Sequence, residues 1–235
     1  MTEFEKQFHE VQELLEFNDF NQTIKRVIDF TLDTENIDFY TKTNEFLNWL
    51  DHNEKEDEDK KTRLKALLDE LHAFLSKKEC HNHQTIISVK NLQKVYNASF
   101  GLGPINLDIK TGEIIGLVGE NGNGKTTLLR SLCGELHPTA GTINYQFQYD
   151  DLYDLRTKLV YIPQRTDTWR GSMYENLEFT ASCYGYSPEE NNLVVDLVIT
   201  RLGLRKFRRH YWNNLSSGYK MRFELARMLL RKPKI

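Results

Sequence analysis

A glycine-rich stretch with one lysine and two threonines contains the residues most suited to chemistry. Gly119, Gly124, Lys125 and Thr126 fit the pattern G-x-x-x-x-G-K-[ST]. Glycine permits backbone angles that other residues avoid, so successive N–H groups can face one anion. The lysine would contact terminal phosphates and Thr126 a Mg²⁺ ion. The predicted nucleotide contacts in this loop are Gly119, Glu120, Asn121, Gly122, Asn123, Gly124, Lys125, Thr126 and Thr127.

The elements on either side of this loop decide between a phosphate site and an ordinary glycine-rich turn. The apolar run 114–118 predicts a short buried strand before the loop. Leu128, Leu129 and Leu132 have helical spacing after it. A strand, this loop and a helix in that order form the setting in which the motif binds phosphate, so we favour the phosphate site.

Length and composition restrict the class of protein. The 235 residues are enough for one large or two ordinary domains. No run of about 18 apolar residues is present, which predicts no membrane span. The acidic start lacks an apolar segment, so a secretory signal is not expected. Three cysteines, Cys80, Cys133 and Cys183, are typical of a reduced cytosolic protein.

Charge is distributed unevenly along the chain. Residues 1–84 contain 11 basic and 20 acidic residues, whereas residues 85–235 contain 20 and 14, which gives balances of −9 and +6. This asymmetry predicts an acidic helical domain at 1–84 and a second domain at 85–235. It also argues against the first domain gripping nucleic acid through its phosphates.

The first domain shows four amphipathic patterns, which predict a small helical bundle or two stacked hairpins. Asn18 or Asp19 is expected to cap the second helix, and Thr34 to start the third. The charged run 51–61 predicts a solvated turn and the start of a fourth helix. Docking, dimerisation or regulation are the expected roles. Residues 80–83 contain a cysteine and two histidines, but without a second ligand pair a polar linker is favoured over a zinc site.

Two strands around residues 86–89 and 105–109 precede the loop, with Tyr96 between them. In this order the chain resembles the ATP-binding cassette (ABC) ATPase family. The resemblance implies an α/β fold, a P-loop NTPase domain of the ABC type, here preceded by the all-α domain. It also implies that Tyr96 stacks on adenine; the alternative is a tyrosine packed in a small antiparallel sheet.

Further family markers follow along the chain. Residues 136–143 resemble the family's turn from helix to strand, and the apolar run 159–163 predicts another strand ending at Gln164. The resemblance implies that Gln164 contacts Mg²⁺ and the attacking water. Residues 171–177 resemble the start of the family's helical arm, with Ser172 and Glu175 as a capping box. A basic cluster is predicted as a solvated loop rather than a nucleic-acid patch: Arg201, Arg205, Lys206, Arg208 and Arg209.

Residues 215–219 resemble the ABC signature L-S-G-G-Q, with Ser217 and Tyr219 as departures. In the family this loop binds the γ-phosphate held by a second subunit, which assigns Ser216 and Gly218 to that role. Residues 233–235 resemble the entry to the family's Walker B strand. That strand, its carboxylates and the switch histidine are absent, so we expect a fragment with weak or no ATPase activity. The resemblance assigns catalysis to Lys125, Gln164, Ser216 and Gly218.

The sequence therefore predicts the ATP-binding subunit of an ABC transporter, with ATP and Mg²⁺ as ligands. Expected partners are a second cassette and a membrane permease, and the expected location is the cytoplasmic face of the membrane. Nucleic acid is not expected as a partner. Two alternatives stay open: a soluble ABC ATPase acting on the ribosome or nucleic acid, and a non-catalytic interaction protein that senses nucleotide.

Overall fold

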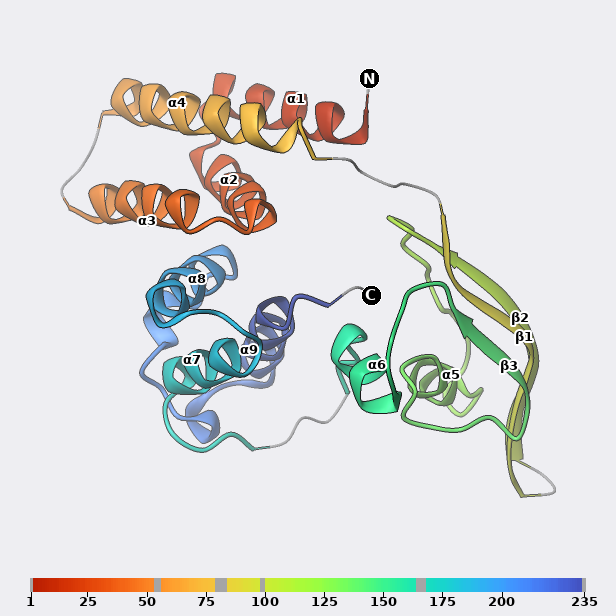
Figure 1. Ribbon diagram of the computed structural model, residues 1–235. Helices are drawn as coiled ribbons and strands as arrows, with labels where there is room; N and C mark the ends of the chain where they lie inside the picture. Colours follow the sequence, from red (N-terminus) through yellow and green to blue (C-terminus); the bar gives the residue numbers. More distant parts are fainter. Residues whose placement is uncertain (1, 53–55, 79–83, 98–99, 164–167, 234–235) are drawn as a thin grey trace. The chain divides into compact units, whose positions relative to one another are not determined.

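The computed structural model describes residues 2–52, 56–78, 84–97, 100–163 and 168–233 (Figure 1). These residues form two compact units, the first of which is built from two separate stretches of the chain. The first unit combines the N-terminal helices with the helices after residue 168, and the second contains the strands and helices between residues 84 and 163. The stretch predicted as one domain, 85–235, is thus divided between the two units.

Four helices form the N-terminal part of the first unit, as the periodicity predicts. Asp19 caps the second helix by accepting a hydrogen bond from the Gln22 N–H at 3.1 Å. The predicted start of the third helix is wrong by two residues: Thr34 ends the second helix, and Asn36 caps the third by accepting from the Asp38 N–H at 2.8 Å. The four helices are α1 (Glu3–Glu16), α2 (Phe20–Thr34), α3 (Ile37–Asp51) and α4 (Asp57–Leu75).

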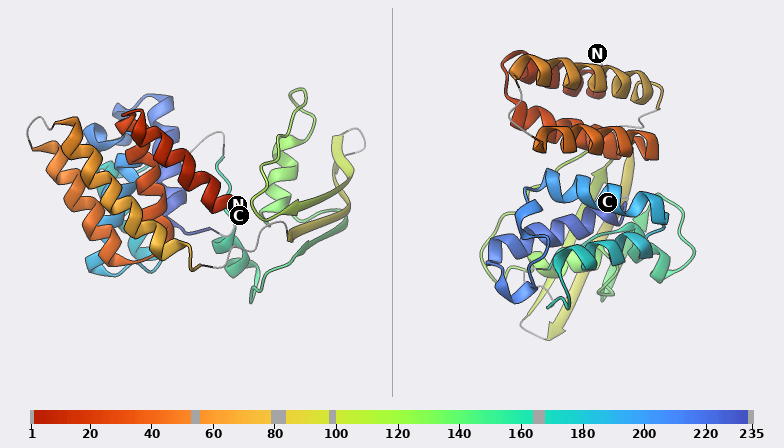
Figure 2. Two further views of the ribbon diagram at one scale, coloured as in Figure 1. Left: turned by 90° about the horizontal axis from the view of Figure 1, so that it is seen from above. Right: turned by 90° about the vertical axis from the view of Figure 1, so that its left-hand side faces the viewer.

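Three more helices complete this unit (Figure 2). They are α7 (Met173–Cys183), α8 (Pro188–Arg201) and α9 (Ser217–Leu230), and the short 3₁₀ helices η1 (Arg205–Phe207) and η2 (Trp212–Asn214) lie between α8 and α9. Helix α8 packs against α2 and α3 on one side and against α7 and α9 on the other, so one hydrophobic core runs through the unit. Among the described helices, none is both long and apolar enough to cross a bilayer.

The second unit is built on a three-stranded antiparallel sheet. Its strands are β1 (Thr85–Asn97), β2 (Phe100–Lys110) and β3 (Ala140–Tyr145), in the order β2-β1-β3. Helices α5 (Lys125–Leu132) and α6 (Leu152–Lys158) bury one face of this sheet, where Ile87, Val89 and Leu92 pack with Leu128 and Leu155. The first two strands were expected from their apolar patterns and β3 from the family resemblance of residues 136–143, and α5 follows the leucine spacing.

Two predicted strands are not formed among the described residues. Ile114 and Val118 lie in an extended segment outside the sheet, with 97% and 95% of their surfaces exposed. Residues 159–163 are likewise outside the sheet, although Leu159 is buried. A strand is defined by its ladder of hydrogen bonds, and no described strand pairs with either segment. The prediction of a buried strand at 114–118 is therefore wrong for this structure.

Candidate functional site

The predicted phosphate loop joins β2 to the N-terminus of α5. Residues 121–124 form the turn, and Lys125 is the first residue of the helix. The Asn123 N–H donates to the Glu120 carbonyl at 3.3 Å, which closes the turn. The free N–H groups of the first helical turn then face the loop, where the positive end of the helix dipole favours an anion.

The side chain of Lys125 folds back over this loop. Its Nζ donates to the carbonyl oxygens of Gly119 and Glu120, at 2.7 Å in each case. The ammonium group is thus held beside the backbone that the sequence predicts to surround a phosphate. A lysine at this place can exchange a carbonyl contact for a stronger bond to a phosphate oxygen, in which donor and acceptor are both charged.

Two glycines of the loop need the conformation that only glycine adopts readily. Gly122 has a φ of 91° and Gly124 a φ of 78°. A Cβ on Gly124 would also approach Leu102 Cδ1 to 2.7 Å, whereas a Cβ on Gly119 would meet no atom within 4 Å. The backbone therefore requires glycine at 122 and 124, while the glycine at 119 leaves open space beside the loop.

Tyr96 lies close to the start of α5, as its proposed role requires. Its hydroxyl is 3.4 Å from the Thr127 Oγ1, and its half-exposed ring lies 5.6 Å from the Phe100 ring. Lys94 Nζ lies 5.8 Å from the centre of the same ring. The structure thus brings together Tyr96 and the predicted phosphate contacts in one unit, with about half of the tyrosine exposed.

The predicted signature residues belong to the other unit. Ser216 caps α9 with an extended backbone, and its side chain makes no capping hydrogen bond. The adjacent Gly218 has open space where a Cβ would lie. Tyr219, which replaces the family's glutamine, packs its ring 3.9 Å from that of Phe207. The hydroxyl of Ser216 and the first turn of α9 are therefore exposed and available to a ligand. Gln164 lies outside the described residues.

The start of the helical arm is formed as the sequence predicts. Ser172 and Glu175 make both hydrogen bonds of a capping box at α7. The Ser172 N–H holds the pKa of the Glu175 carboxyl below its usual value. The basic cluster, however, is not a solvated loop throughout. Arg201 and Arg205 make ion pairs with Asp29 and Asp51 of the acidic helices, so that part of the prediction is wrong.

A buried cluster beneath the signature helix was not predicted. The Glu224 carboxylate is 2% exposed; it accepts a hydrogen bond from Trp169 Nε1 at 3.0 Å and pairs with Arg227 Nη2 at 2.6 Å. The Trp169 ring stacks on Trp212 with ring centres 5.0 Å apart. These contacts tie the segment after residue 168 to α9. The only signal in the sequence is a glutamate between apolar residues of a predicted helix, which is too common to single out.

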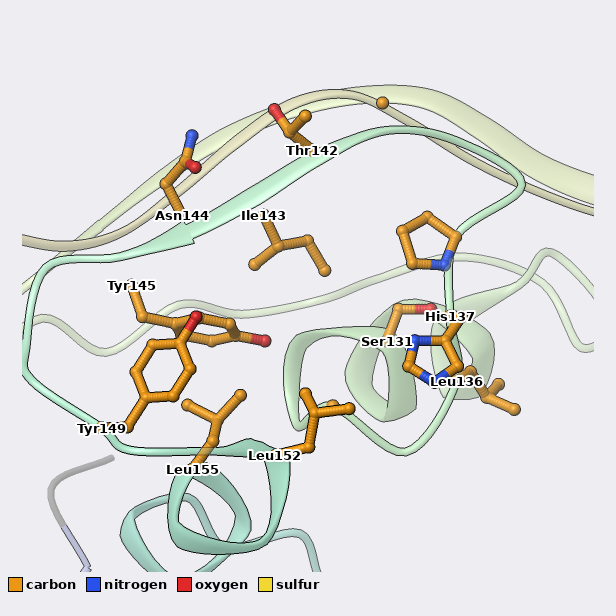
Figure 3. A pocket seen from close by; sticks show the side chains of 13 residues that line it. Ser131, Leu136, His137, Thr142, Ile143, Asn144, Tyr145, Tyr149, Leu152 and Leu155 are labelled. Carbon is orange, nitrogen blue, oxygen red and sulfur yellow. The ribbon is translucent and has the colours of Figure 1, made fainter.

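A cavity of about 340 Å³ lies at the opposite end of α5 from the phosphate loop (Figure 3). Tyr145, Tyr149 and Leu155 point into it from β3, the following segment and α6. The Tyr145 hydroxyl donates to the Leu132 carbonyl at 2.7 Å, and burial raises the pKa of Tyr145 to about 12. The cavity contains none of the predicted nucleotide contacts.

Comparison with known proteins agrees with this geometry. The family model described as ABC transporter matches residues 102–235, which is more than half of the chain. The chain belongs to the ABC transporter family. The match includes the phosphate loop and the signature residues, and it leaves the acidic helices at 2–78 outside.

Individual members of the ABC transporter family resemble a large part of the chain. The methionine import ATP-binding protein MetN 1 of Acinetobacter baylyi is 35% identical over 161 residues, covering 63% of this chain and 45% of that protein. The sulfate/thiosulfate import ATP-binding protein CysA of Pseudomonas aeruginosa is 33% identical over 155 residues, covering 63% and 47%. The chain thus spans about half the length of these curated relatives.

A solved structure supports the ABC-type P-loop NTPase fold. CbiO1 from Clostridium perfringens, described as part of the ABC transporter complex CbiONQ, matches with a TM-score of 0.57 and 28% identity. The alignment covers 64% of this chain and 63% of that one. The fold predicted from the sequence motifs is confirmed, with an additional set of helices before it.

Proposed function

We propose that the chain binds ATP with Mg²⁺ at the loop between β2 and α5, as the ATP-binding subunit of an ABC transporter. The observation that carries this proposal is the position of Lys125, whose Nζ is held against the Gly119 and Glu120 carbonyls at the N-terminus of α5. A lysine, a helix N-terminus and glycines with positive φ form a cradle for the phosphates of a nucleotide.

The residues of the loop have distinct roles in this proposal. The backbone N–H groups between Gly122 and Thr127 would bind the phosphates, and Lys125 would neutralise their charge. Thr126, with Gln164, would hold Mg²⁺, which supplies charge neutralisation at the terminal phosphates. Tyr96 would stack on the adenine, because an aromatic face accepts a purine without requiring specific hydrogen bonds.

The exposed Ser216 and Gly218 would contact a nucleotide held by a second cassette, so each site would be completed by a partner chain. Closure of two cassettes around ATP, and reopening after hydrolysis, would drive a permease. The arm offers a place for the permease to dock. A cavity of about 540 Å³ at the start of α7 is lined by Tyr174, Arg208 and Tyr211. We propose a cytoplasmic location beside the permease on this basis.

The relatives favour transport over the two alternatives. MetN 1 and CysA are both named as ATP-binding proteins of import systems, which is why transport is proposed ahead of the alternatives. The part of the proposal that is tested on this chain alone is nucleotide binding.

The direct test is Lys125→Ala. We expect affinity for Mg-ATP, measured by calorimetry or with a fluorescent analogue, to fall at least about 100-fold. The variant loses a charge-assisted contact and leaves a desolvated phosphate without its cationic partner. Lys110→Ala, an exposed lysine at the end of β2, is the matched control and should bind as the wild type does. Unchanged affinity in Lys125→Ala would reject the site.

A further inference from the structure

The N-terminal helices and the helical arm share one interface within the first unit (Figure 2). Helices α2 and α3 lie along α8, and the fully buried Tyr40 belongs to the core that they share. Asn44 of α3 is buried at this interface, where its Nδ2 donates to the carbonyls of Tyr40 and Leu193 at 2.8 and 3.0 Å. A buried amide placed on the backbone of another helix fixes the two helices in one register.

Two ion pairs close the interface at the end of α8 that leads to the signature. Arg201 binds Asp29 with two parallel bonds, Nε to Oδ1 at 2.6 Å and Nη2 to Oδ2 at 2.9 Å. Arg205 Nη1 lies 2.7 Å from Asp51 Oδ2. The side chains of the first pair are each 30% exposed, and the two-bond geometry is the one that gives a guanidinium pair specificity.

The segment between these arginines and Ser216 is held at several points. The backbone N–H groups of Met173 and Tyr174 donate to the His210 and Arg208 carbonyls at 3.0 and 2.9 Å. Trp212 is buried, and the Phe207 ring contacts Tyr219 in the first turn of α9. A segment packed in this way behaves as a short rigid link, so a displacement at Arg201 and Arg205 would reach Ser216.

We propose that residues 2–78 are a partner of the arm built into the same chain, and that Asp29 and Asp51 position the signature loop through Arg201 and Arg205. The proposal rests on the proposed function only in the role given to Ser216. Two carboxylates of the acidic helices are thus paired with basic residues of the second part of the chain.

The test compares amide hydrogen exchange of the complete chain without nucleotide. In Asp29→Asn/Asp51→Asn, we expect peptides covering residues 203–216 to exchange at least about fivefold faster than in the wild type, since these pairs hold one end of the segment. Glu45→Gln/Asp69→Asn removes the same charge from exposed positions on α3 and α4 and should leave this segment unchanged. Unchanged exchange at 203–216 in the first variant overturns the proposal.

A conservative pair of changes separates positioning from general loosening. Asp29→Glu/Asp51→Glu keeps both carboxylates, and we expect exchange within about twofold of the wild type because longer side chains can still reach the arginines. If this variant exchanges as fast as the asparagine variant, or if faster exchange is confined to α2 and α3, the carboxylates do not position the loop. The measurement needs no nucleotide, so it is independent of the Lys125→Ala result that tests the proposed function.

Discussion

The buried Glu224 gives a prediction whose magnitude follows from how far water reaches two of its partners. Trp169, which donates to one carboxylate oxygen, is 8% exposed, whereas the Arg227 side chain on the other oxygen is 39% exposed. Water can replace the guanidinium at the surface, but it cannot reach the position of the indole N–H. Loss of the indole donor should therefore cost more than loss of the charged partner.

The two variants that test this are Trp169→Phe and Arg227→Met. Trp169→Phe keeps an aromatic ring against Trp212 but removes the N–H, and a hydrogen bond to a charged group contributes roughly 1.5–3 kcal/mol. The phenyl ring also makes less contact with Trp212 than the indole does, so we expect the free energy of unfolding to fall by about 2–3 kcal/mol in total. Arg227→Met preserves the length of the side chain, and we expect a loss of about 1 kcal/mol, since water can take the place of the partly exposed guanidinium.

Urea unfolding followed by far-ultraviolet circular dichroism measures both changes, because the affected unit contains most of the helices. Phe179→Leu, on the exposed face of α7, is the control and should change stability by less than about 0.5 kcal/mol. If Arg227→Met destabilises the protein as much as Trp169→Phe, or if Trp169→Phe unfolds at the wild-type urea concentration, access to water does not set the energies around Glu224.

Two further predictions concern the loop and the acidic helices. Gly124→Ala should lower thermal stability by about 1–2 kcal/mol, because alanine is strained at a φ of 78°, whereas Gly119→Ala should be neutral in the same melt; equal effects would contradict the geometry. Burial, with the nearby Asp29, raises the pKa of Asp33 to about 6, so between pH 4 and 6 the folded state binds more protons than the unfolded state and stability falls as pH rises. Asp33→Asn removes this loss, and urea titrations at pH 4.5 and 7 should show a gain relative to the wild type at the higher pH. We expect about 1 kcal/mol or less, because Asp33 is exposed at the surface although the surrounding protein desolvates part of its carboxyl; no pH dependence in the difference would reject the shift.

Features encoded within a few residues could be predicted from the sequence. The capping box of Ser172 and Glu175, the cap at Asp19 and the helix that begins at Lys125 depend on local spacing, and the structure contains all three. The start of α3 was misplaced because Thr34 and Asn36 are both suitable caps two positions apart. Capping propensity alone does not decide between Thr34 and Asn36.

Features that depend on distant partners could not be predicted. Arg201 and Asp29 lie 172 positions apart, and nothing in either segment indicates the other. The apolar run at 114–118 has the composition of a buried strand, but a strand also needs neighbours to bond with, which composition does not supply. The roles of Tyr96, Gln164, Ser216 and Gly218 came from the family resemblance and remain predictions.

The shared core of the first unit has a consequence for synthesis on the ribosome. Helices α1 to α4 are complete at Leu75, yet α8, the helix that packs on α2 and α3, ends at Arg201, roughly 125 residues later. At about 5–20 residues per second, the nascent N-terminal helices would wait on the order of 6–25 s with an uncovered apolar face. A nascent chain in that interval is a natural client for a chaperone, and separate expression of the first 78 residues would make the exposure permanent.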